Sequence, residues 1–442
     1  IGRKKRYDRD AVINAAMGLF RTRGFAATSA DVLVRELGIS RHSLYAEFGS
    51  KQGLFDAALR RYDESVLERN FGIDYTTTTH IEDMYQYPLQ GAYSDGRIAD
   101  FGDAGLRGNW GWGGNPFLWL TYRTQNPWTA HYSQPALEEG RGDLYRWLWY
   151  TTGLETKQRE ELVPSRHFPV RGAMFMRSDW SDESNILTFK SGPNSNHYHV
   201  DQGTFLLHAG GELLVSEVGL EHSRGFHSYY ANLYFPAYDT QAAGHNVLLV
   251  DGDPESQFPA DYRNGIAALN SWPRVRHSFA GWRFDEVEAD LACVYKDKLA
   301  SYTRSFLFVK PDIIVMYDQV RSTDGHFYSW LFHAEDNDGE SSITQDGNRF
   351  RIERPQAYLD MDVLSPSMES VSVRAGVRNE SFLQLTSAAD LRAVDFLAVM
   401  VPSLGAAPEE RNMTSEQVIF DGWIGTKVER GDAVIRAFFR TG

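Results

Sequence analysis

Proline and tryptophan are so unevenly distributed that the chain cannot be one uniform fold. All 16 prolines lie at Pro88 or later, and all 11 tryptophans lie at Trp110 or later. A proline-free start followed by a body rich in Trp, Pro and Gly indicates two domains of different origin. Domains hold about 100–200 residues each. A chain of 442 residues is therefore expected to contain two or three domains.

Charge divides the chain at a similar place. Residues 1–70 hold 13 Lys and Arg against 9 Asp and Glu, a net charge of +4; the remainder holds 32 against 50, a net charge of −18. No run reaches the roughly 18 apolar residues of a membrane-spanning helix, so no membrane partner is expected. The single cysteine, Cys293, excludes an internal disulfide and a cysteine-ligated metal cluster.

Residues 1–70 carry the start and stop signals of four helices. Apolar side chains recur at three- and four-residue steps, and glycines follow the expected ends. The expected helices run from Asp8 to Arg23, from Thr28-Ser29 to Gly38, from Arg41 to Phe48, and from Lys51 to about Arg69. Two short helices joined by a tight turn at Gly38 predict a helix-turn-helix, whose second helix can enter the major groove of DNA.

The stretch Ala15–Leu59, with its G-F-x-x-T-S, G-I-S and L-Y-x-x-F-x-S-K elements, resembles the DNA-binding domain of TetR-family transcriptional regulators. The resemblance implies DNA as a partner, and a possible homodimer because palindromic operators need one. A helical bundle with a solvated basic tail is the alternative. By resemblance, bases or phosphates are contacted by Arg41, His42, Ser43 and Tyr45, and the DNA backbone by Thr28 and Lys51. Phosphate attraction is added by Arg3, Lys4, Lys5 and Arg6.

From about Val170 onward the apolar period changes to two, which predicts strands. The strand-like runs are GAMFMRSD, NILTFKSG, GTFLLHAG, HNVLLVDG, RSFLFVKPDIIVMYDQV, FYSWLFHAE, VDFLAVMV, VIFDGWI and AVIRAFF. Runs of strands without intervening helices favour an antiparallel sandwich. The expected fold class is multidomain α and β: an all-α helix-turn-helix domain at 1–70, a helical junction at 71–168 with helices at Asn115–Thr124 and Pro135–Tyr150, and a C-terminal antiparallel β-sandwich at 169–442.

The segment Gly192–Gly219, GPNSNHYHVDQGTFLLHAGGELLVSEVG, followed by Gly244-His245-Asn246, resembles the heparinase II/III-like polysaccharide lyases. RGAMFMRSDW upstream, the run Tyr302–Asp318, and WLFH ending at His333 extend the resemblance over about residues 80–442. It implies an (α/α) toroid before a β-sandwich, with the glycan bound between them. The family's toroid is several times longer than residues 71–168 allow, so this segment is expected to be a truncated (α/α) toroid remnant.

Two histidines alternate in this segment. On an extended strand, His197 and His199 would point to the same face. By resemblance, His197 faces the substrate cleft as a catalytic residue, and His199 binds a structural zinc ion with Glu217 and His245. Two histidines and a carboxylate form a plausible zinc set, although the family usually has aspartate where this chain has Glu217. The alternative is that these are ordinary hydrogen-bonded core histidines.

A lyase removes the proton alpha to a uronate carboxyl group and expels the 4-linked oxygen, which requires an acid, a base and groups that stabilise the enolate. The family uses a tyrosine between the zinc carboxylate and the last histidine. Tyr229, Tyr230, Tyr234 and Tyr238 all lie there, and Tyr230 is favoured as catalytic. By the same resemblance, Arg224 and Asn196 are expected to bind substrate, Arg224 by pairing with a carboxylate.

The predicted function is β-elimination on uronic-acid glycans, alginate- or heparin-like, by a chain that looks chimeric. One alternative is a TetR-like regulator whose β-domain only binds acidic sugars; another is a carbohydrate-binding remnant with neither activity. The expected partners are an acidic polysaccharide or oligosaccharide and DNA. The expected location is cytoplasmic if the head acts on DNA, and periplasmic or secreted for the lyase part alone.

Overall fold

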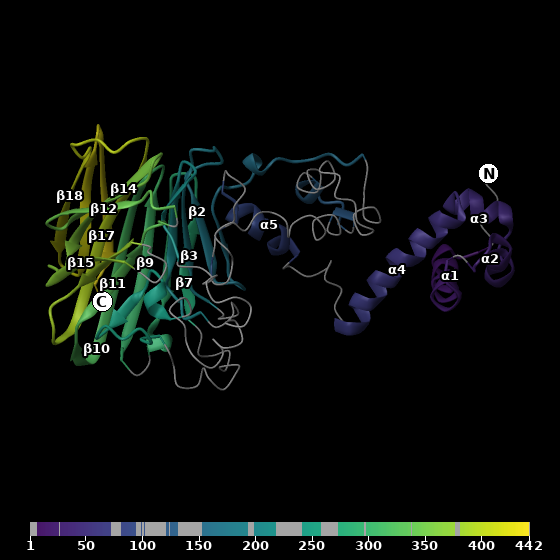
Figure 1. Cartoon of the computed structure of the whole chain (residues 1–442), viewed down its shortest axis with the longest axis horizontal. Helices are drawn as coiled ribbons and strands as arrows, with labels where there is room; N and C mark the ends of the chain where they lie inside the picture. Colours follow the sequence, from purple (N-terminus) through teal and green to yellow (C-terminus); the bar gives the residue numbers. More distant parts are fainter. Residues whose placement is uncertain are drawn as a thin grey trace. The chain divides into compact units, whose positions relative to one another are not determined.

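The computed structural model divides the chain into two compact units: residues 1–85 with 113–157, and residues 86–112 with 158–442. The segment 71–168 contributes to both units. Figure 1 shows the helical head and the layered strands, each described below by itself. The structure describes residues 7–25, 27–71, 81–93, 99, 101, 121–122, 124–130, 153–192, 199–217, 241–257, 273–295, 298–336, 338–375 and 381–441.

The four predicted head helices are confirmed as α1 (Arg9–Arg23), α2 (Ala30–Leu37), α3 (Arg41–Phe48) and α4 (Lys51–Phe71). Side-chain oxygens cap the first three, because the opening amides of a helix have no partner within it. Asp8 accepts from the amide of Asp10 at 2.8 Å, and Ser40 from that of Ser43 at 3.0 Å. Leu33, Leu44 and Leu54 are fully buried between the helices, so the head has a core of its own.

A fifth helix, α5 (Ile81–Gly91), ends against the β-rich unit. The Tyr87 ring meets Phe168 and Phe175 edge-on, each at 5.2 Å between ring centroids. The buried guanidinium of Arg177 donates to the carbonyl of Gln90 at 2.9 Å and also to that of Ala92. A cation at a helix C-terminus satisfies carbonyls that the helix itself leaves unpaired. The end of α5 is thus fixed on the sheet.

All the strand pairs are antiparallel, and they form four sheets in the described residues. A five-stranded sheet has the order β1 (Arg166–Phe168), β2 (Ala173–Arg177), β3 (Asn185–Lys190), β4 (Phe205–Ala209), β5 (Glu212–Val215). A four-stranded sheet has the order β15 (Ser370–Ala375), β16 (Ser381–Thr386), β11 (Tyr328–His333), β6 (Leu248–Val250).

The largest sheet has eight strands and the last has three. The eight-stranded order is β12 (Ser342–Asp346), β13 (Arg349–Glu353), β14 (Ala357–Ser365), β17 (Leu391–Leu404), β10 (Ile313–His326), β9 (Ser301–Val309), β8 (Phe284–Asp290), β7 (Arg274–Ala280). The three-stranded order is β18 (Met413–Phe420), β19 (Trp423–Arg430), β20 (Ala433–Arg440). Short 3-10 turns occur at Arg159–Glu161, Ala242–Gly244 and Ala292–Tyr295.

Two apolar cores separate these sheets into three layers. Ile314 and Met316 of β10 share a core with the five- and four-stranded sheets. Ile313 and Val315, which alternate with them along the strand, face a second core shared with Ile424 and other residues of the three-stranded sheet. Successive side chains of a strand point to opposite faces. The middle of the eight-stranded sheet is therefore buried on both sides, and the predicted sandwich has a third layer.

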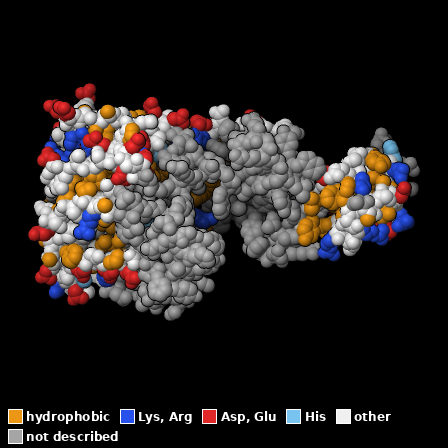
Figure 2. All heavy atoms as spheres, in the orientation of Figure 1, with side chains coloured by type: hydrophobic (Ala, Val, Ile, Leu, Met, Phe, Trp, Pro, Cys, Tyr) orange, Lys and Arg blue, Asp and Glu red, His pale blue; other side chains and the backbone are white. Residues whose placement is uncertain are grey.

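Each predicted run contains strand residues, but RSFLFVKPDIIVMYDQV is two strands, β9 and β10, and VIFDGWI spans the turn between β18 and β19. Strands β1, β5, β7, β8 and β12–β16 were not predicted. The helices expected at Asn115–Thr124 and Pro135–Tyr150 lie largely outside the described residues. In the view of Figure 2, Lys and Arg side chains gather on the head, and Asp and Glu side chains border the β-rich part. No helix of the described part of the chain is long and apolar enough to cross a membrane.

Candidate functional site

The three predicted zinc ligands lie together in the β-rich unit, although 46 positions separate the first from the last in sequence. His199 precedes β4, Glu217 follows β5, and His245 lies between a 3-10 turn and β6. Nδ1 of His245 is 3.3 Å from Oε1 of Glu217, and the rings of His199 and His245 are 5.3 Å apart between centroids. All three are buried, with Glu217 only 2% exposed. The fold thus brings together the three residues that the resemblance implies as zinc ligands; the zinc itself remains a prediction.

A buried ion pair borders this group. Nζ of Lys190, on β3, is 2.5 Å from Oδ2 of Asp201, and neither side chain is more than 6% exposed. Burial raises the pKa of Asp201, but Lys190 and then His245 oppose it, and the net shift is downward. Burial lowers the pKa of His245, while Glu217 and then Asp201 raise it, with a net upward shift. The charged forms of both residues are stabilised in the interior by their neighbours.

Asn246 connects the segments that carry these residues. Its Nδ2 donates to the carbonyl of Ser216 at 2.6 Å, next to Glu217, and to the carbonyl of Phe205 at 2.8 Å. Its Oδ1 accepts from the backbone amide of His333 at 2.7 Å. A buried amide with its donors and acceptor satisfied holds one arrangement of the backbone. Asn246 therefore fixes the position of His245 relative to Glu217.

Arg304 makes a second connection from the central sheet. Its Nη1 donates to the carbonyl of Gly203 at 2.6 Å and to that of Asn246 at 2.9 Å. Its other nitrogens bind both carboxylate oxygens of Asp318, at 2.9 and 2.8 Å. Asp318 also accepts from the indole of Trp330 at 2.8 Å. The guanidinium thereby links the turn that follows His199 to the segment of His245.

Two histidines and a glutamate suit zinc by their donor chemistry. Nε2 of His245 is buried and has no hydrogen-bond partner among the described residues, so one ring nitrogen remains available. Glu217 and His245 are paired with each other in this structure. Across the described ranges, no group of three His, Cys, Asp or Glu side chains is arranged to hold a metal ion.

Other predicted site residues fall outside the described part of the chain. These are the predicted catalytic residues His197 and Tyr230, the alternatives Tyr229, Tyr234 and Tyr238, and the predicted substrate-binding residues Asn196 and Arg224. Their roles remain predictions.

The third head helix exposes the side chains predicted to face DNA. Arg41, His42 and Tyr45 are exposed on α3, with Tyr45 44% accessible. Arg41 forms an exposed ion pair with Asp31 of α2. The hydroxyl of Ser43 is 2.8 Å from that of Ser40, so Ser43 also takes part in the cap of the helix. The exposed set projects from one short helix, as groove recognition requires.

Thr28 and Lys51 are held within the head. Thr28 is fully buried, and its hydroxyl donates to the carbonyl of Gly24 at 2.7 Å. This side chain therefore shapes the turn before α2, and its DNA contact stays a prediction. The ammonium of Lys51 donates to the carbonyl of Phe25 at 2.9 Å and lies 3.9 Å from the centroid of that ring. Lys51 is only partly exposed, so it also stabilises the head.

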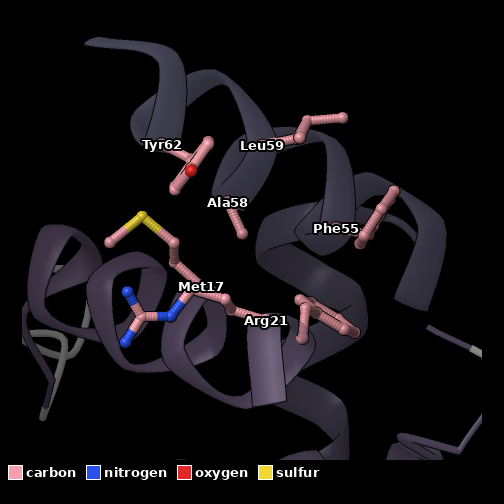
Figure 3. Close-up of a pocket in the computed structure, with 7 residues that line it drawn as sticks. Met17, Arg21, Phe55, Ala58, Leu59 and Tyr62 are labelled. Atoms are coloured by element: carbon pink, nitrogen blue, oxygen red, sulfur yellow. The ribbon is translucent and has the colours of Figure 1, made fainter. Parts of the chain in front are cut away.

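A small apolar hollow of about 210 Å³ lies between α1 and α4. Figure 3 shows Met17 and Arg21 of α1 facing Phe55, Ala58 and Tyr62 of α4. Its lining is almost entirely carbon, and α3 contributes no residue to it. This hollow is separate from the surface predicted to face DNA.

The family model for the C-terminal domain of heparinase II/III-like proteins matches residues 161–398, more than half of the chain. The chain belongs to the heparinase II/III-like family. The matched region includes the three buried residues His199, Glu217 and His245. The N-terminal domain model of bacterial TetR-family regulatory proteins matches residues 12–58, so a TetR-type head is joined to a heparinase II/III-like domain.

Solved structures agree on the fold. The heparan sulfate lyase HepC from Pedobacter heparinus is similar with a TM-score of 0.60 at 15% identity, covering 99% of this chain and 67% of that one. A heparinase III, the BT4657 gene product, gives a TM-score of 0.57 at 15% identity, covering 88% of this chain and 56% of that one. At such low identity the likeness shows the fold alone.

Curated relatives match the head. The transcriptional repressor ComR of Escherichia coli K12 is 51% identical over 61 residues, 14% of this chain and 29% of ComR. The repressor BdcR of the same strain is 46% identical over 61 residues, 14% of this chain and 31% of BdcR. The chain spans about a third of the length of these relatives.

Sequence reasoning did not assign roles to Lys190, Asn246 or Arg304 in this heparinase II/III-like domain. Asn246 and Arg304 stand in the motifs that carried the resemblance, which was the available signal. Lys190 ends an ordinary-looking strand run, and nothing in its local sequence indicates an acidic partner 11 residues later.

Proposed function

We propose that the chain is a polysaccharide lyase that cleaves uronic-acid glycans by β-elimination and carries a DNA-binding head. The observation that carries the proposal is the convergence of His199, Glu217 and His245 within a heparinase II/III-like domain. Buried titratable groups held by charged partners are typical of functional sites. The names of HepC and heparinase III support a glycan substrate.

The buried group explains how a catalytic histidine would be presented. His199 is fully enclosed, and Arg304 and Asn246 fix the backbone on either side of the group. His197, two residues earlier, would then be held at the cleft as acid or base. In the proposed reaction, one of Tyr230 and His197 removes the proton alpha to the carboxyl group, and the bond to the 4-linked oxygen breaks as the double bond forms. The other residue donates a proton to the leaving oxygen, while Arg224 and Asn196 bind the substrate.

The test is the ultraviolet absorbance of unsaturated uronate after incubation with alginate, heparin or heparan sulfate. We expect new absorbance with at least one glycan and none from His197→Ala. His277→Ala, an exposed histidine on β7, serves as the matched control and should retain the wild-type rate. Absence of product from all three glycans would sink the proposed activity.

We propose that zinc binds His199, Glu217 and His245 and supplies a structural link between three distant segments. The donor types and their burial support this assignment. Since metal binding contributes to folding, His199→Ala and His245→Ala should lose zinc and lower the melting temperature. His197→Ala should retain zinc and lose only turnover. Elemental analysis decides: metal-free wild type, or equal loss from His197→Ala and His199→Ala, would contradict these roles.

The second proposed function is transcriptional regulation through DNA binding by the head, in the cytoplasm and as a homodimer. The exposed set Arg41, His42 and Tyr45 on α3 favours it. Tyr45→Ala should weaken binding in a gel shift, whereas Arg35→Ala, exposed on α2, should not. Binding without preference for any sequence would argue against regulation, because phosphate contacts alone carry no base information.

A further inference from the structure

The outer face of the four-stranded sheet carries an ordered array of polar side chains. Its register places Ser370, Thr386 and Ser329 in one row across β15, β16 and β11. The next row contains Ser372, Gln384 and Leu331, and the third contains Arg374, Phe382 and His333. The polar groups on this face are therefore hydroxyls in the first row, an amide in the second, and a cation beside an aromatic ring in the third.

This face is hollowed rather than flat. A cavity of about 490 Å³ lies over it, within the range of about 300–1,000 Å³ typical of ligand pockets. Ala243, Pro254 and Phe327 form its walls, and polar and apolar atoms line it about equally. The loops on either side of β6 thus enclose the polar rows.

Several polar groups in the hollow are left for a ligand. Gln384 donates from Nε2 to the hydroxyl of Ser329 at 3.2 Å, which leaves its carbonyl oxygen as an acceptor. Arg374 donates through Nε to Ser372 at 3.2 Å and, among the described residues, forms no ion pair. An exposed guanidinium has further N–H donors in a fork that matches a carboxylate.

The third row leads toward the predicted zinc ligands. The His333 ring stacks on Phe382 at 4.8 Å between centroids, and its Nδ1 lies 3.2 Å from Oδ1 of Asn246. Asn246 directly follows His245. Phe382, which lines the hollow, is therefore connected through His333 and Asn246 to the buried group of His199, Glu217 and His245.

The chemistry favours a sugar acid over a peptide. A peptide would pair with backbone groups of the edge strand β15, whereas this hollow offers side chains on the face of the sheet. Hydroxyl and amide groups match sugar hydroxyls, and Arg374 matches one carboxylate. We infer that this hollow is an accessory subsite for a uronate-containing oligosaccharide; the choice of sugar rests on the proposed function.

The test is calorimetric titration of the full chain with an alginate hexasaccharide, and with cellohexaose as the neutral comparison. Arg374→Gln and Gln384→Leu should each weaken binding, Arg374→Gln on the order of tenfold, because a hydrogen bond to a charged group contributes about 1.5–3 kcal/mol. Arg392→Gln, an exposed arginine on β17, removes the same charge elsewhere and should bind as wild type. The basic head contributes equally in every protein compared.

Three results would overturn the inference: equal affinity in all four proteins, loss in Arg374→Gln without loss in Gln384→Leu, or equal binding of cellohexaose. The second would indicate a surface charge rather than a built site. All four proteins carry His197→Ala in addition, so that binding is measured without turnover. Failure of lyase activity and failure of this subsite therefore give separate results.

Discussion

Arg304 and Asp318 form a fully buried ion pair, with side-chain exposures of 1% and 0%. Removing one member leaves the other charged and unpaired, which costs about 3–5 kcal/mol. We expect Arg304→Ala to lower the free energy of unfolding by that order in a urea titration. Arg392→Ala should change it by less than about 0.5 kcal/mol, as is usual for surface sites. Similar losses from both variants would contradict the role of the buried pair.

Cys293 is the chain's single thiol and gives an unambiguous chemical readout. Burial, and then the neighbouring Asp290 carboxylate, raise the pKa of Cys293 to about 11. At pH 8 only about one thiol in a thousand is therefore in the reactive thiolate form. We expect slow labelling by a disulfide reagent in the folded chain, faster labelling as the pH rises toward 11, and rapid labelling after unfolding. Equally fast labelling before and after unfolding would refute this.

Single residues also show how far sequence reasoning reached. The grouping of His199, Glu217 and His245 was implied by the resemblance to the heparinase II/III-like family. The contacts of Arg304 with Gly203 and Asn246 span 101 and 58 positions, so only the folded sheets bring them together. Thr28 was assigned from its motif position, whereas its burial depends on how α1 and α2 pack.

Among the elements, the three-stranded sheet covers one face of the central sheet through β19. Val428 and Ile424 point into the core that this layer shares with Val315. We expect Val428→Asp to destabilise this layer strongly, because an unpaired carboxylate would be buried there. Glu429→Gln, next to it on the exposed face, serves as control. Hydrogen exchange should increase over β18–β20; unchanged protection in Val428→Asp would show that the layer does not depend on this core.

Helices with clear start and stop residues were predicted from the sequence, whereas the edge strands of the eight-stranded sheet were not. The capped helices α1–α3 follow from glycine stops and Ser or Asp starts. Strands β7 and β12 lie at the two edges of the eight-stranded sheet, are mostly exposed and have few apolar residues. Their pairing comes from the neighbouring strand rather than from their own pattern.

At the scale of the whole molecule, the helical head and the β-rich part should unfold separately, since each has its own core. The head contains no tryptophan, so helical circular dichroism and tryptophan fluorescence report different parts. Leu44→Ala removes a fully buried side chain of the head. It should destabilise the head by about 2–5 kcal/mol. We expect the helical transition to shift and the fluorescence transition to remain. A common shift of both signals would show one cooperative unit.

The double burial of the eight-stranded sheet has a consequence for how this chain can change over generations. In a strand with one solvent-exposed face, every second residue can be replaced by a polar one with little loss of stability. At the start of β10, Ile313, Ile314, Val315 and Met316 all enter a core, alternating between the two. These four residues therefore include no solvent-facing position at which a polar side chain would be tolerated. We therefore expect random mutagenesis to recover polar substitutions at the exposed positions of β12 and almost none in this part of β10, whichever way the side chain points.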